Sequence, residues 1–412
     1  MATPDDLGPA VDVLFTAAAG RLLTTFTDST SCHACRCYRR FGRKDRLKHT
    51  MQATQRRRWL APFRRRRLRV AVPAPLMQHS PRTGHGRVWG RVLAGLADRV
   101  ALEPVDSPVS SEGIEADVWL ACGHSGAPKV DEPVVAAVHE VGWTTQELRR
   151  FLDPGFARRM AVTTTGGVRA AARVLTPSES SRRQVLDAYG VPADRVRTVP
   201  YGVDLSVFRP GLTGGRSRVG AVTATDNAAY VLFVGTFHPR KNLPAVRQAV
   251  AGLARRGFHH VLALVGADAS DRDSSDELRR AAEAELPGAP GRVVSLPGRE
   301  DSELAELMAG ADAVCLPSFS EGFGLTALEA MACGTPVVVS DRGSLPEVVD
   351  GSGLIVPPTA PAVEEALVRI LSDAAFAARL RSAARLRAER FTWERTVDGW
   401  LDVLERAAWK AR

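Results

Sequence analysis

The segment that most constrains this chain is residues 313–340, AVCLPSFSEGFGLTALEAMACGTPVVVS. Its apolar run at 313–316 predicts a buried parallel strand, and the Pro, Ser and Gly residues at 317–324 predict a turn. A short helix is expected from about Leu325 to Cys333, ending at a glycine suited to a left-handed cap, and a second strand at 337–340. A loop of free backbone N–H groups would then lie at a helix N-terminus above the carboxyl end of a strand, where anionic ligands bind in open α/β sheets.

Two glutamates flank this turn and carry its chemistry. Glu329 lies inside the predicted helix among apolar residues, where an unpaired carboxylate is unfavourable. A ribose diol supplies two donors to such a carboxylate, so a nucleoside would explain the residue. Glu321, on the preceding loop, would then face the group beyond the phosphates, namely a sugar. An ordinary strand, loop and helix with two solvated glutamates is the alternative if the pair stood alone.

A second segment, upstream, supports the nucleotide interpretation. Residues 230–234, YVLFV, predict a buried strand that ends at Gly235, and GTFHPRKNLP follows as a loop. This loop carries Arg240 and Lys241, and only five of the 55 Lys+Arg residues in the chain are lysines. Two fixed cations near a diphosphate would stabilise the charge that develops as it leaves.

Both segments resemble those of a known enzyme family. The run SEGFGLTALEAMACGTPVV at 320–338 is similar to the donor-binding signature of the retaining GT-B glycosyltransferases of family 4, in which two glutamates separated by seven residues frame the sugar and ribose contacts. The resemblance implies that Glu321 binds sugar hydroxyls and that Glu329 binds the ribose hydroxyls. It also implies that four residues contact the sugar and diphosphate, the first three through their backbone: Phe323, Gly324, Leu325 and Thr326.

The family usually places an Arg directly after the strand-end Gly and a Lys a few residues further on. Here Thr236 follows Gly235 and occupies the Arg position, while Lys241 matches the Lys position. Gly235 and Thr236 are therefore expected in the donor site, with Lys241 as a catalytic counter-charge to the diphosphate. Arg240 is inferred to be its substitute partner, and a solvated cation at a helix start is the alternative.

The amino-proximal half must supply the acceptor side. Residues 68–75, LRVAVPAP, predict a first strand, and residues 79–97 predict a glycine-rich loop that enters an amphipathic helix. Gly84 and Gly86 begin a dinucleotide-type fingerprint, but its third glycine is displaced, so the fingerprint fails. By the resemblance this loop closes over the donor through Gly84, Gly86 and Arg87. A flexible connecting loop is the alternative.

A histidine follows an apolar run in the same half. Residues 134–143, VVAAVHEVGW, predict a strand that ends at His139 and Glu140. A His at the carboxyl end of a strand more often serves function than one inside a helix, and a hydrogen-bonded structural His is the alternative. By the resemblance His139 lies near the reacting sugar and orients it. Ser178 is expected to cap a helix first and to contact the acceptor second.

The positive charge is concentrated at the start of the chain. Residues 1–67 hold fifteen Lys+Arg against five Asp+Glu, a balance of +10 in a chain whose formal charge is +9. The run RRRWLAPFRRRR at 56–67 suits contact with anionic phospholipid or nucleic acid. A zinc site is not expected at Cys32, His33, Cys35 and Cys37, because no second ligand pair follows at a characteristic spacing. We interpret 1–67 as a disordered extension, with peripheral membrane contact through 56–67 left open.

The whole chain has 412 residues, 45% of them hydrophobic, and its alternating patterns indicate a soluble α/β protein. We expect a GT-B fold, with two Rossmann-like domains facing a central cleft and a C-terminal helix crossing back to the first domain. The expected divisions are an extension at 1–67, an acceptor-binding domain at 68–212, a linker at 213–228, a nucleotide-sugar-binding domain at 229–390 and a crossover helix at 391–412. An acidic start without a secretory signal predicts a cytoplasmic protein, with the inner face of the membrane as the open alternative.

The resemblance implies retaining transfer of a hexosyl group from a nucleoside diphosphate sugar to a glycan, lipid-linked or small-molecule acceptor, as in the synthesis of cell-envelope polysaccharide in bacteria. The loop at 235–244 is similar to that of bacterial mannosyltransferases, which makes GDP-mannose the first donor to test, before a UDP-sugar. No cofactor and no metal are expected, because Lys241 and the helix N-terminus at Leu325 would replace the cation. The rivals are a sugar-nucleotide-binding protein without turnover and a nucleic-acid binder acting through 1–67. Nucleic-acid binding is not expected, and it would weaken steeply with salt.

Overall fold

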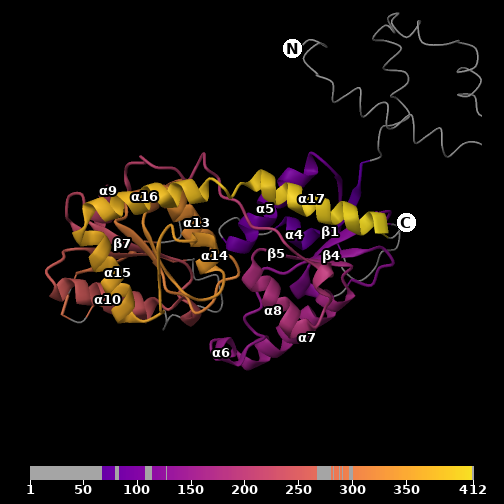
Figure 1. Ribbon diagram of the computed structural model, residues 1–412, viewed down its shortest axis with the longest axis horizontal. Helices are drawn as coiled ribbons and strands as arrows, with labels where there is room; N and C mark the ends of the chain where they lie inside the picture. The colour runs from indigo at the N-terminus through magenta and orange to yellow at the C-terminus, as the bar shows by residue number, and fades with distance from the viewer. Residues whose placement is uncertain are drawn as a thin grey trace, which may run out of the picture. The chain divides into compact units, whose positions relative to one another are not determined.

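The computed structural model describes residues 67–78, 83–106, 114–126, 128–266, 280–281, 283–286, 288–289, 291–296 and 300–410. Residues from Arg67 onward form one compact unit. Two six-stranded parallel sheets organise it, the first in the indigo and magenta part of Figure 1 and the second in the orange part. The basic run at 56–67, apart from its last residue, and the four candidate zinc ligands lie outside the described residues.

The first sheet has the strand order β2-β1-β3-β4-β5-β6, and all neighbouring strands are parallel. Its strands are β1 (Arg69–Pro73), β2 (Ala101–Val105), β3 (Val118–Cys122), β4 (Val134–Ala137), β5 (Arg173–Thr176) and β6 (Val196–Thr198). The helices of this half are α4 (Ala74–Met77), α5 (Gly84–Ala97), α6 (Gln146–Arg149), α7 (Pro154–Ala170) and α8 (Glu179–Tyr189), with short 3-10 turns η3 (Gly123–Ser125) and η4 (Ala193–Arg195).

The second sheet has the order β12-β11-β10-β7-β8-β9, which is the doubly wound arrangement of nucleotide-binding folds. Its strands are β7 (Tyr230–Val234), β8 (Val261–Val265), β9 (Val293–Leu296), β10 (Ala313–Leu316), β11 (Val337–Ser340) and β12 (Leu354–Val356). The helices are α9 (Gly215–Thr223), α10 (Leu243–Arg255), α12 (Asp301–Gly310), α13 (Leu325–Ala332), α14 (Leu345–Val349), α15 (Ala360–Ser372) and α16 (Ala374–Ala388), with the 3-10 turn η5 (Pro239–Lys241). The order of connection reverses between β7 and β10, so this is the switch point of the sheet.

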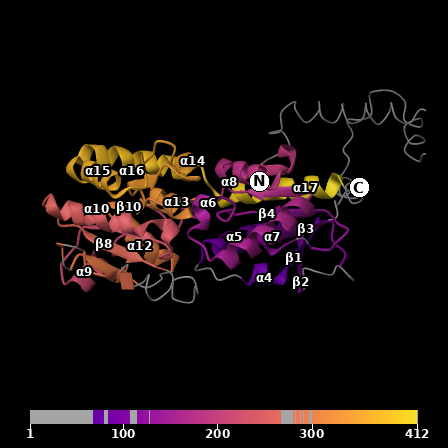
Figure 2. The ribbon, with the colours of Figure 1, turned by 90° about the horizontal axis from the view of Figure 1, so that it is seen from below.

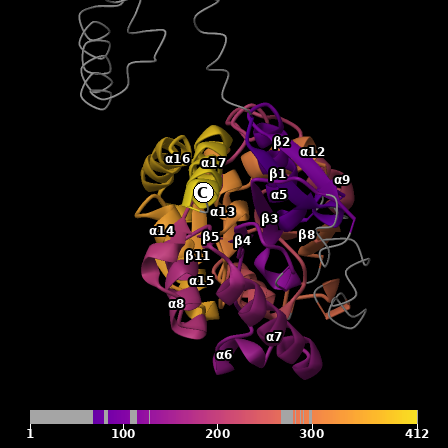
Figure 3. The ribbon, with the colours of Figure 1, turned by 90° about the vertical axis from the view of Figure 1, so that its right-hand side faces the viewer.

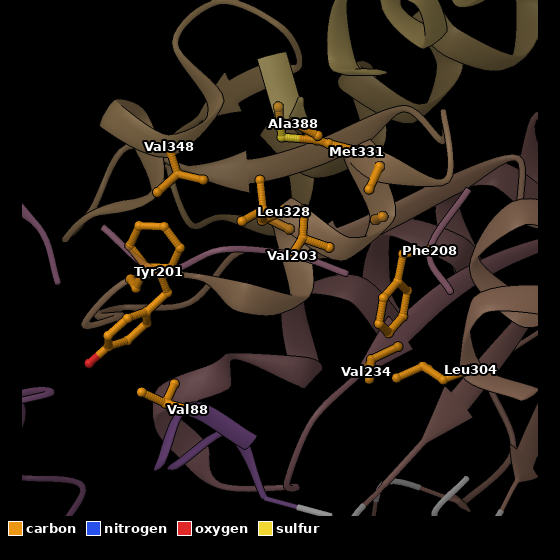
Figure 4. Packing of buried hydrophobic residues seen from close by; sticks show 14 of the residues in the cluster. Val88, Tyr201, Val203, Phe208, Val234, Leu304, Leu328, Met331, Val348 and Ala388 are labelled. Carbon is orange, nitrogen blue, oxygen red and sulfur yellow. The ribbon is translucent and has the colours of Figure 1, made fainter. Parts of the chain in front are cut away.

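The central strands are apolar along their whole length because both of their faces are covered. In β7, Tyr230, Leu232 and Val234 belong to one buried cluster, whereas Val231 and Phe233 belong to another. This alternation follows the two-residue period of a strand. Figure 4 shows part of the first cluster, in which Val234 lies near Leu304 and Phe208. Burial on both faces is typical of parallel sheets, and it explains why these strands were predictable from unbroken apolar runs.

The chain returns to the first sheet through its last helix, α17 (Trp393–Lys410), drawn in yellow beside α5 in Figures 1 and 2. Trp400 packs edge-on against Trp89 of α5, with ring centroids 5.4 Å apart. Figure 3 shows α16 and α17 as successive yellow helices along this return. The fold is therefore the GT-B arrangement expected from the sequence, with the C-terminal helix on the first half. None of the helices in the described ranges combines the length and apolar character needed to cross a bilayer.

Four local features differ from expectation. The first strand is shorter than 68–75, because β1 ends at Pro73 and helix α4 begins at Ala74, with Pro75 in its first turn. The strand expected to end at His139 and Glu140 ends at Ala137, so His139 follows the strand rather than closing it. Gly84 and Gly86 lie in the first turn of α5 rather than in a loop, because the Thr83 hydroxyl accepts a hydrogen bond from Gly86 N and caps the helix. The segment 213–228 contains α9, which packs against α12.

Candidate active site

The two motif loops begin at neighbouring strands of the second sheet. β7 and β10 pair directly, with Val231 beside Ala313 and Leu232 beside Val314. Both strands run in the same direction, so the loop after Val234 and the loop after Leu316 leave the sheet at the same edge. This edge is the switch point, where ligands bind in folds of this type.

Glu321 is at the centre of this edge and is only 8% exposed. Its Oε1 accepts hydrogen bonds from Lys241 Nζ and Ser318 Oγ, each at 2.7 Å. Arg240 Nη1 lies 3.5 Å from its Oε2. Burial alone would raise the pKa of Glu321, but Lys241, Arg240 and the two hydrogen bonds hold that pKa below its usual value. Glu321 is therefore ionised, and its hydrogen bonds fix the orientation of its carboxylate group.

Lys241 reaches Glu321 across Gly235. Gly235 has φ +146°, and a Cβ added there would lie 3.7 Å from Lys241 Cε. The lysine stem therefore passes beside the end of β7, and the positive φ of Gly235, rather than a lack of space, favours a glycine there. Thr236, the next residue, is half-buried in the same loop. The structure thus places Gly235 beside Lys241, as expected of two donor-site residues, whereas the part of Thr236 in donor binding stays a prediction.

Arg240 is held between the two halves of the compact unit. Its Nη1 donates to the Ser320 carbonyl at 2.6 Å, and its Nη2 lies 3.4 Å from Glu140 Oε2 in the first half. Its own carbonyl accepts a hydrogen bond from Phe319 N at 2.8 Å. With 18% of its side chain exposed, Arg240 is not the solvated cation that we considered as an alternative.

The N-terminus of α13 is left without a side-chain cap. Gly324 has φ +100° and precedes Leu325 with no side chain accepting from the first turn. The free N–H groups of this turn can therefore donate hydrogen bonds to an anionic oxygen. Gly84, the first residue of α5, lies beside it: a Cβ on Gly84 would be 4.0 Å from Leu325 Cδ1. Two helix N-termini, with Thr326 half-buried at one of them, thus meet at the same place.

Glu329 lies on α13 and is 4% exposed. Arg87 of α5 donates from Nη1 to Glu329 Oε1 at 2.6 Å, and it lies 3.4 Å from Asp301. Glu329 Oε2 and Arg87 Nε are buried without a hydrogen-bond partner. Burial raises the pKa of Glu329 to about 7, although Arg87 acts in the opposite direction. One acceptor and one donor of this ion pair are thus left unsatisfied, and a diol could supply partners to them.

This raised pKa predicts a pH-dependent stability. Between about pH 4.5 and 7 folded Glu329 holds a proton that the unfolded chain has lost. Stability should therefore fall as pH rises through this window, by up to about 3 kcal/mol. Glu329→Gln should flatten that fall, whereas Glu405→Gln, at an exposed position of α17, should keep it. Urea midpoints measured from pH 4.5 to 8 test this, and equal slopes for wild type and Glu329→Gln would contradict it.

His139 lies where β4 meets the second half. Its Nδ1 is hydrogen-bonded to the Tyr201 hydroxyl, and its ring centroid is 4.2 Å from that of His85. A Cβ added to Gly322 would be 2.0 Å from the His139 carbonyl oxygen, so the two backbones are in close contact. The hydrogen bond with Tyr201 supports a structural role for His139. Its role in orienting the donor sugar stays a proposal. Phe323 packs its ring against Tyr201, so its backbone alone is left for a ligand.

The N-terminus of α8, in the first half, also contacts the loop between β10 and α13, which carries Glu321. Ser178 caps α8 by accepting from Ser181 N, as expected. The hydroxyls of Ser178 and Ser181 both donate to the Gly322 carbonyl, at 2.7 and 2.9 Å. These serines therefore fix the loop that carries Glu321. The expectation that Ser178 contacts the acceptor stays untested.

Several site residues carried no clear sequence signal. Ser318 precedes Glu321 by three residues on the same loop. Its hydrogen bond to Glu321 therefore depends on the conformation of that loop, which the sequence does not specify. Other residues that reach the site come from distant segments: His85, His124 and Glu140. Only Glu140 had a signal, its place beside His139 at a strand end. In the described ranges no three His, Cys, Asp or Glu side chains are arranged to hold a metal ion.

Comparison with known proteins agrees with this geometry. Residues 220–387 match the family model "Glycosyl transferases group 1", and residues 115–207 match "Glycosyltransferase Family 4". A D-inositol 3-phosphate glycosyltransferase of Acidothermus cellulolyticus is 34% identical over 312 residues, which are 73% of this chain and 68% of that protein. The protein of the same description from Mycobacterium tuberculosis is 35% identical over 327 residues, 77% of this chain and 66% of that protein. The sucrose-phosphate synthase structure of Thermosynechococcus elongatus matches 84% of this chain and 100% of that chain, with TM-score 0.67 and 21% identity, and so supports the fold.

The two sheets, the donor-type loops at the switch point and these matches define a nucleotide-sugar-dependent glycosyltransferase. The chain belongs to glycosyltransferase family 4, the group 1 glycosyl transferases.

Proposed function

We propose that this enzyme transfers a hexosyl group with retention, and that the donor lies across the edge formed by β7, β10 and the start of α13. The observation that carries the proposal is Glu321, a buried carboxylate held by Lys241 and Ser318 at the switch point. A residue fixed in this way can orient sugar hydroxyls without reorganising during the reaction. Lys241, next to it, is the counter-charge for the diphosphate.

The remaining donor contacts follow from their places around this edge. The uncapped first turn of α13 would hold a phosphate oxygen through backbone N–H groups. Glu329 would accept from the ribose hydroxyls through its unsatisfied oxygen. Because Arg87 already occupies the other oxygen, the ribose must share Glu329 with Arg87 or displace it. His139 would face the sugar from the first half.

The identity of the sugar is open to experiment. We gave GDP-mannose priority from the loop at 235–244, but the relatives are described as D-inositol 3-phosphate glycosyltransferases, which gives the mannosyl expectation no support. A hexosyl group on UDP or GDP fits the proposal equally well. A cyclic polyol acceptor, suggested by the names of those relatives, becomes the first acceptor class to test.

Release of UDP or GDP from a panel of nucleotide sugars, with and without cyclic polyols and sugars as acceptors, tests the proposal. Nucleotide release that depends on acceptor, with a product that keeps the donor's anomeric configuration, is the expected result. The rival is a protein that binds a sugar nucleotide without turnover. Binding of a donor with no release in the presence of any acceptor would favour that rival.

A further inference from the structure

Arg87 and Glu329 form an ion pair that is incomplete on both sides. Arg87 Nη1 donates to Glu329 Oε1 at 2.6 Å, a single contact rather than the two parallel bonds that an arginine and a carboxylate can form. Within the described part of the chain, Arg87 Nε and Glu329 Oε2 are buried and have no hydrogen-bond partner. Nearly all buried polar groups in proteins are hydrogen-bonded, so a spare donor and a spare acceptor in one ion pair indicate that a further group completes it.

Arg87 is held in this position by the helix that carries it. Its backbone N–H donates to the Thr83 carbonyl in the first turn of α5, at 2.9 Å, and Trp89, two residues further on, is fully buried. Asp301, 3.4 Å from Nη1, is a second and partly exposed partner. Moving the guanidinium away from Glu329 would leave a buried carboxylate unpaired, which is strongly unfavourable. A ligand at Glu329 is therefore expected to share the carboxylate with Arg87 rather than to displace Arg87.

The spare groups fit a hydroxyl and not a phosphate. A phosphate oxygen accepts hydrogen bonds and is repelled by a carboxylate, whereas a hydroxyl donates through its hydrogen and accepts through its oxygen. The charge of Arg87 is also already matched by Glu329 and Asp301. Glu329 lies four residues after Leu325, about one helical turn from the end of α13 where we place a phosphate oxygen. The ribose, which is joined to the diphosphate, is the diol that would lie beside Glu329.

We infer that Arg87 is a ribose-binding residue, and that it completes with Glu329 a diol site to which each half of the enzyme contributes one side chain. Glu329 Oε2 accepts from a ribose hydroxyl, and Arg87 Nε donates to a hydroxyl oxygen. The inference rests on the proposed function, since that function places the ribose at Glu329, and it adds the residue that contacts the diol from the first half. Selectivity for ribonucleotides over deoxyribonucleotides then depends on Arg87 as well as on Glu329.

Nucleotides that lack one hydroxyl test this inference without any mutation. UDP or GDP, whichever wild type binds, is titrated calorimetrically at pH 8, beside its 2′-deoxy and 3′-deoxy analogues. At this pH Glu329, whose pKa burial raises to about 7, is mostly ionised. We expect wild type to bind at least one analogue about tenfold or more weakly than the ribonucleotide, because a missing hydroxyl leaves a buried charged group without its partner.

Variants of Arg87 show whether this residue carries the selectivity. Arg87→Lys keeps the positive charge but removes the Nε–H donor. It should bind the ribonucleotide about tenfold more weakly than wild type, and the affinity ratio between the ribonucleotide and at least one analogue should fall by roughly the same factor. Arg87→Met, which has no donor on its side chain, should show both losses as well. Arg91→Lys is the matched control, one turn further along α5 and paired with Asp204 at 2.7 Å, and it should keep the affinity and the ratio.

The outcomes separate this inference from the proposed function. Tighter or unchanged binding of the ribonucleotide by Arg87→Lys would mean that the ribose displaces Arg87, and the inference would be wrong. An equal loss of affinity for the ribonucleotide and both analogues, with the thermal midpoint of wild type, would assign Arg87 to the diphosphate instead. Equal affinities of wild type for all three nucleotides would also overturn the inference. Glycosyl transfer stands in each of these cases, whereas failure to bind or consume any nucleotide sugar would contradict the proposed function.

Discussion

Lys241→Met is expected to lower turnover by on the order of a hundredfold or more, because it removes a preorganised cation from the place where charge develops on the leaving diphosphate. Lys241 Nζ lies 2.7 Å from Glu321, and Thr236 occupies the position where the family usually has an Arg. Lys241 is also the only lysine of the sequence between residues 130 and 409. Glu321 keeps Arg240 and Ser318 as partners in the variant, so the loop should stay folded.

Two variants make this prediction specific. Lys129→Met, at an exposed lysine of the first half, should keep full turnover. Arg240→Ala should be less impaired than Lys241→Met, because Arg240 is already engaged with Glu140 and the Ser320 carbonyl. Steady-state kinetics with circular dichroism as the check on folding decide the order. A larger loss of turnover in Arg240→Ala than in Lys241→Met would contradict the prediction. Arg240 would then be the counter-charge, and it rather than Lys241 would match the Lys position of the family.

Gly322→Ala is expected to abolish most of the activity, because the added methyl group would clash with the backbone of His139 where the two halves meet. A Cβ there would lie 2.0 Å from the His139 carbonyl oxygen and 3.0 Å from its carbonyl carbon, both of them backbone atoms that cannot move aside. The loop must therefore move away from the first half, which breaks the hydrogen bonds of Ser178 and Ser181 to the Gly322 carbonyl. A displacement of about 1 Å at a reacting centre lowers turnover on the order of a hundredfold.

Gly142→Ala is the matched control, because a Cβ on this nearby glycine meets nothing within 4 Å. It should keep both activity and stability. Measured kcat values for the two variants, together with their thermal midpoints, distinguish a displaced loop from an unfolded protein. Activity of Gly322→Ala close to that of Gly142→Ala would show that this contact has no part in catalysis.

The second sheet and its donor loops could be predicted from the sequence because their signals are local. Strands β7, β10 and β11 are unbroken apolar runs that end at turn residues, and their observed bounds are those expected. Gly334 takes the left-handed conformation expected of a helix cap, with φ +71°. The spacing of Glu321 and Glu329 specified the loop and helix between them. Local sequence rules are sufficient for such elements.

The contacts between the halves could not be predicted in the same way. Arg87 and Glu329 are separated by 242 residues, and nothing in either segment specifies the other. The glycines at 84 and 86 suggested a loop, but the Thr83 cap and the burial of Gly86 against the core place them in a helix. Arg240 was expected to neutralise charge on the diphosphate. Its ion pair with Glu140 depends on the fold, which brings the end of β4 close to the loop at 235–244. Tertiary packing decides these cases, as it often overrides local propensity.

Calorimetric titration of UDP and GDP into wild type, Glu329→Ala and Glu321→Ala tests the central claim most directly, namely that these two glutamates divide the donor between ribose and sugar. A nucleoside diphosphate keeps the ribose and lacks the sugar. We therefore predict that wild type binds one of the two nucleotides, that Glu329→Ala binds it at least about tenfold more weakly, and that Glu321→Ala binds it as wild type does while losing turnover. Undiminished binding by Glu329→Ala, or an equal loss in both variants, would contradict this division of the site.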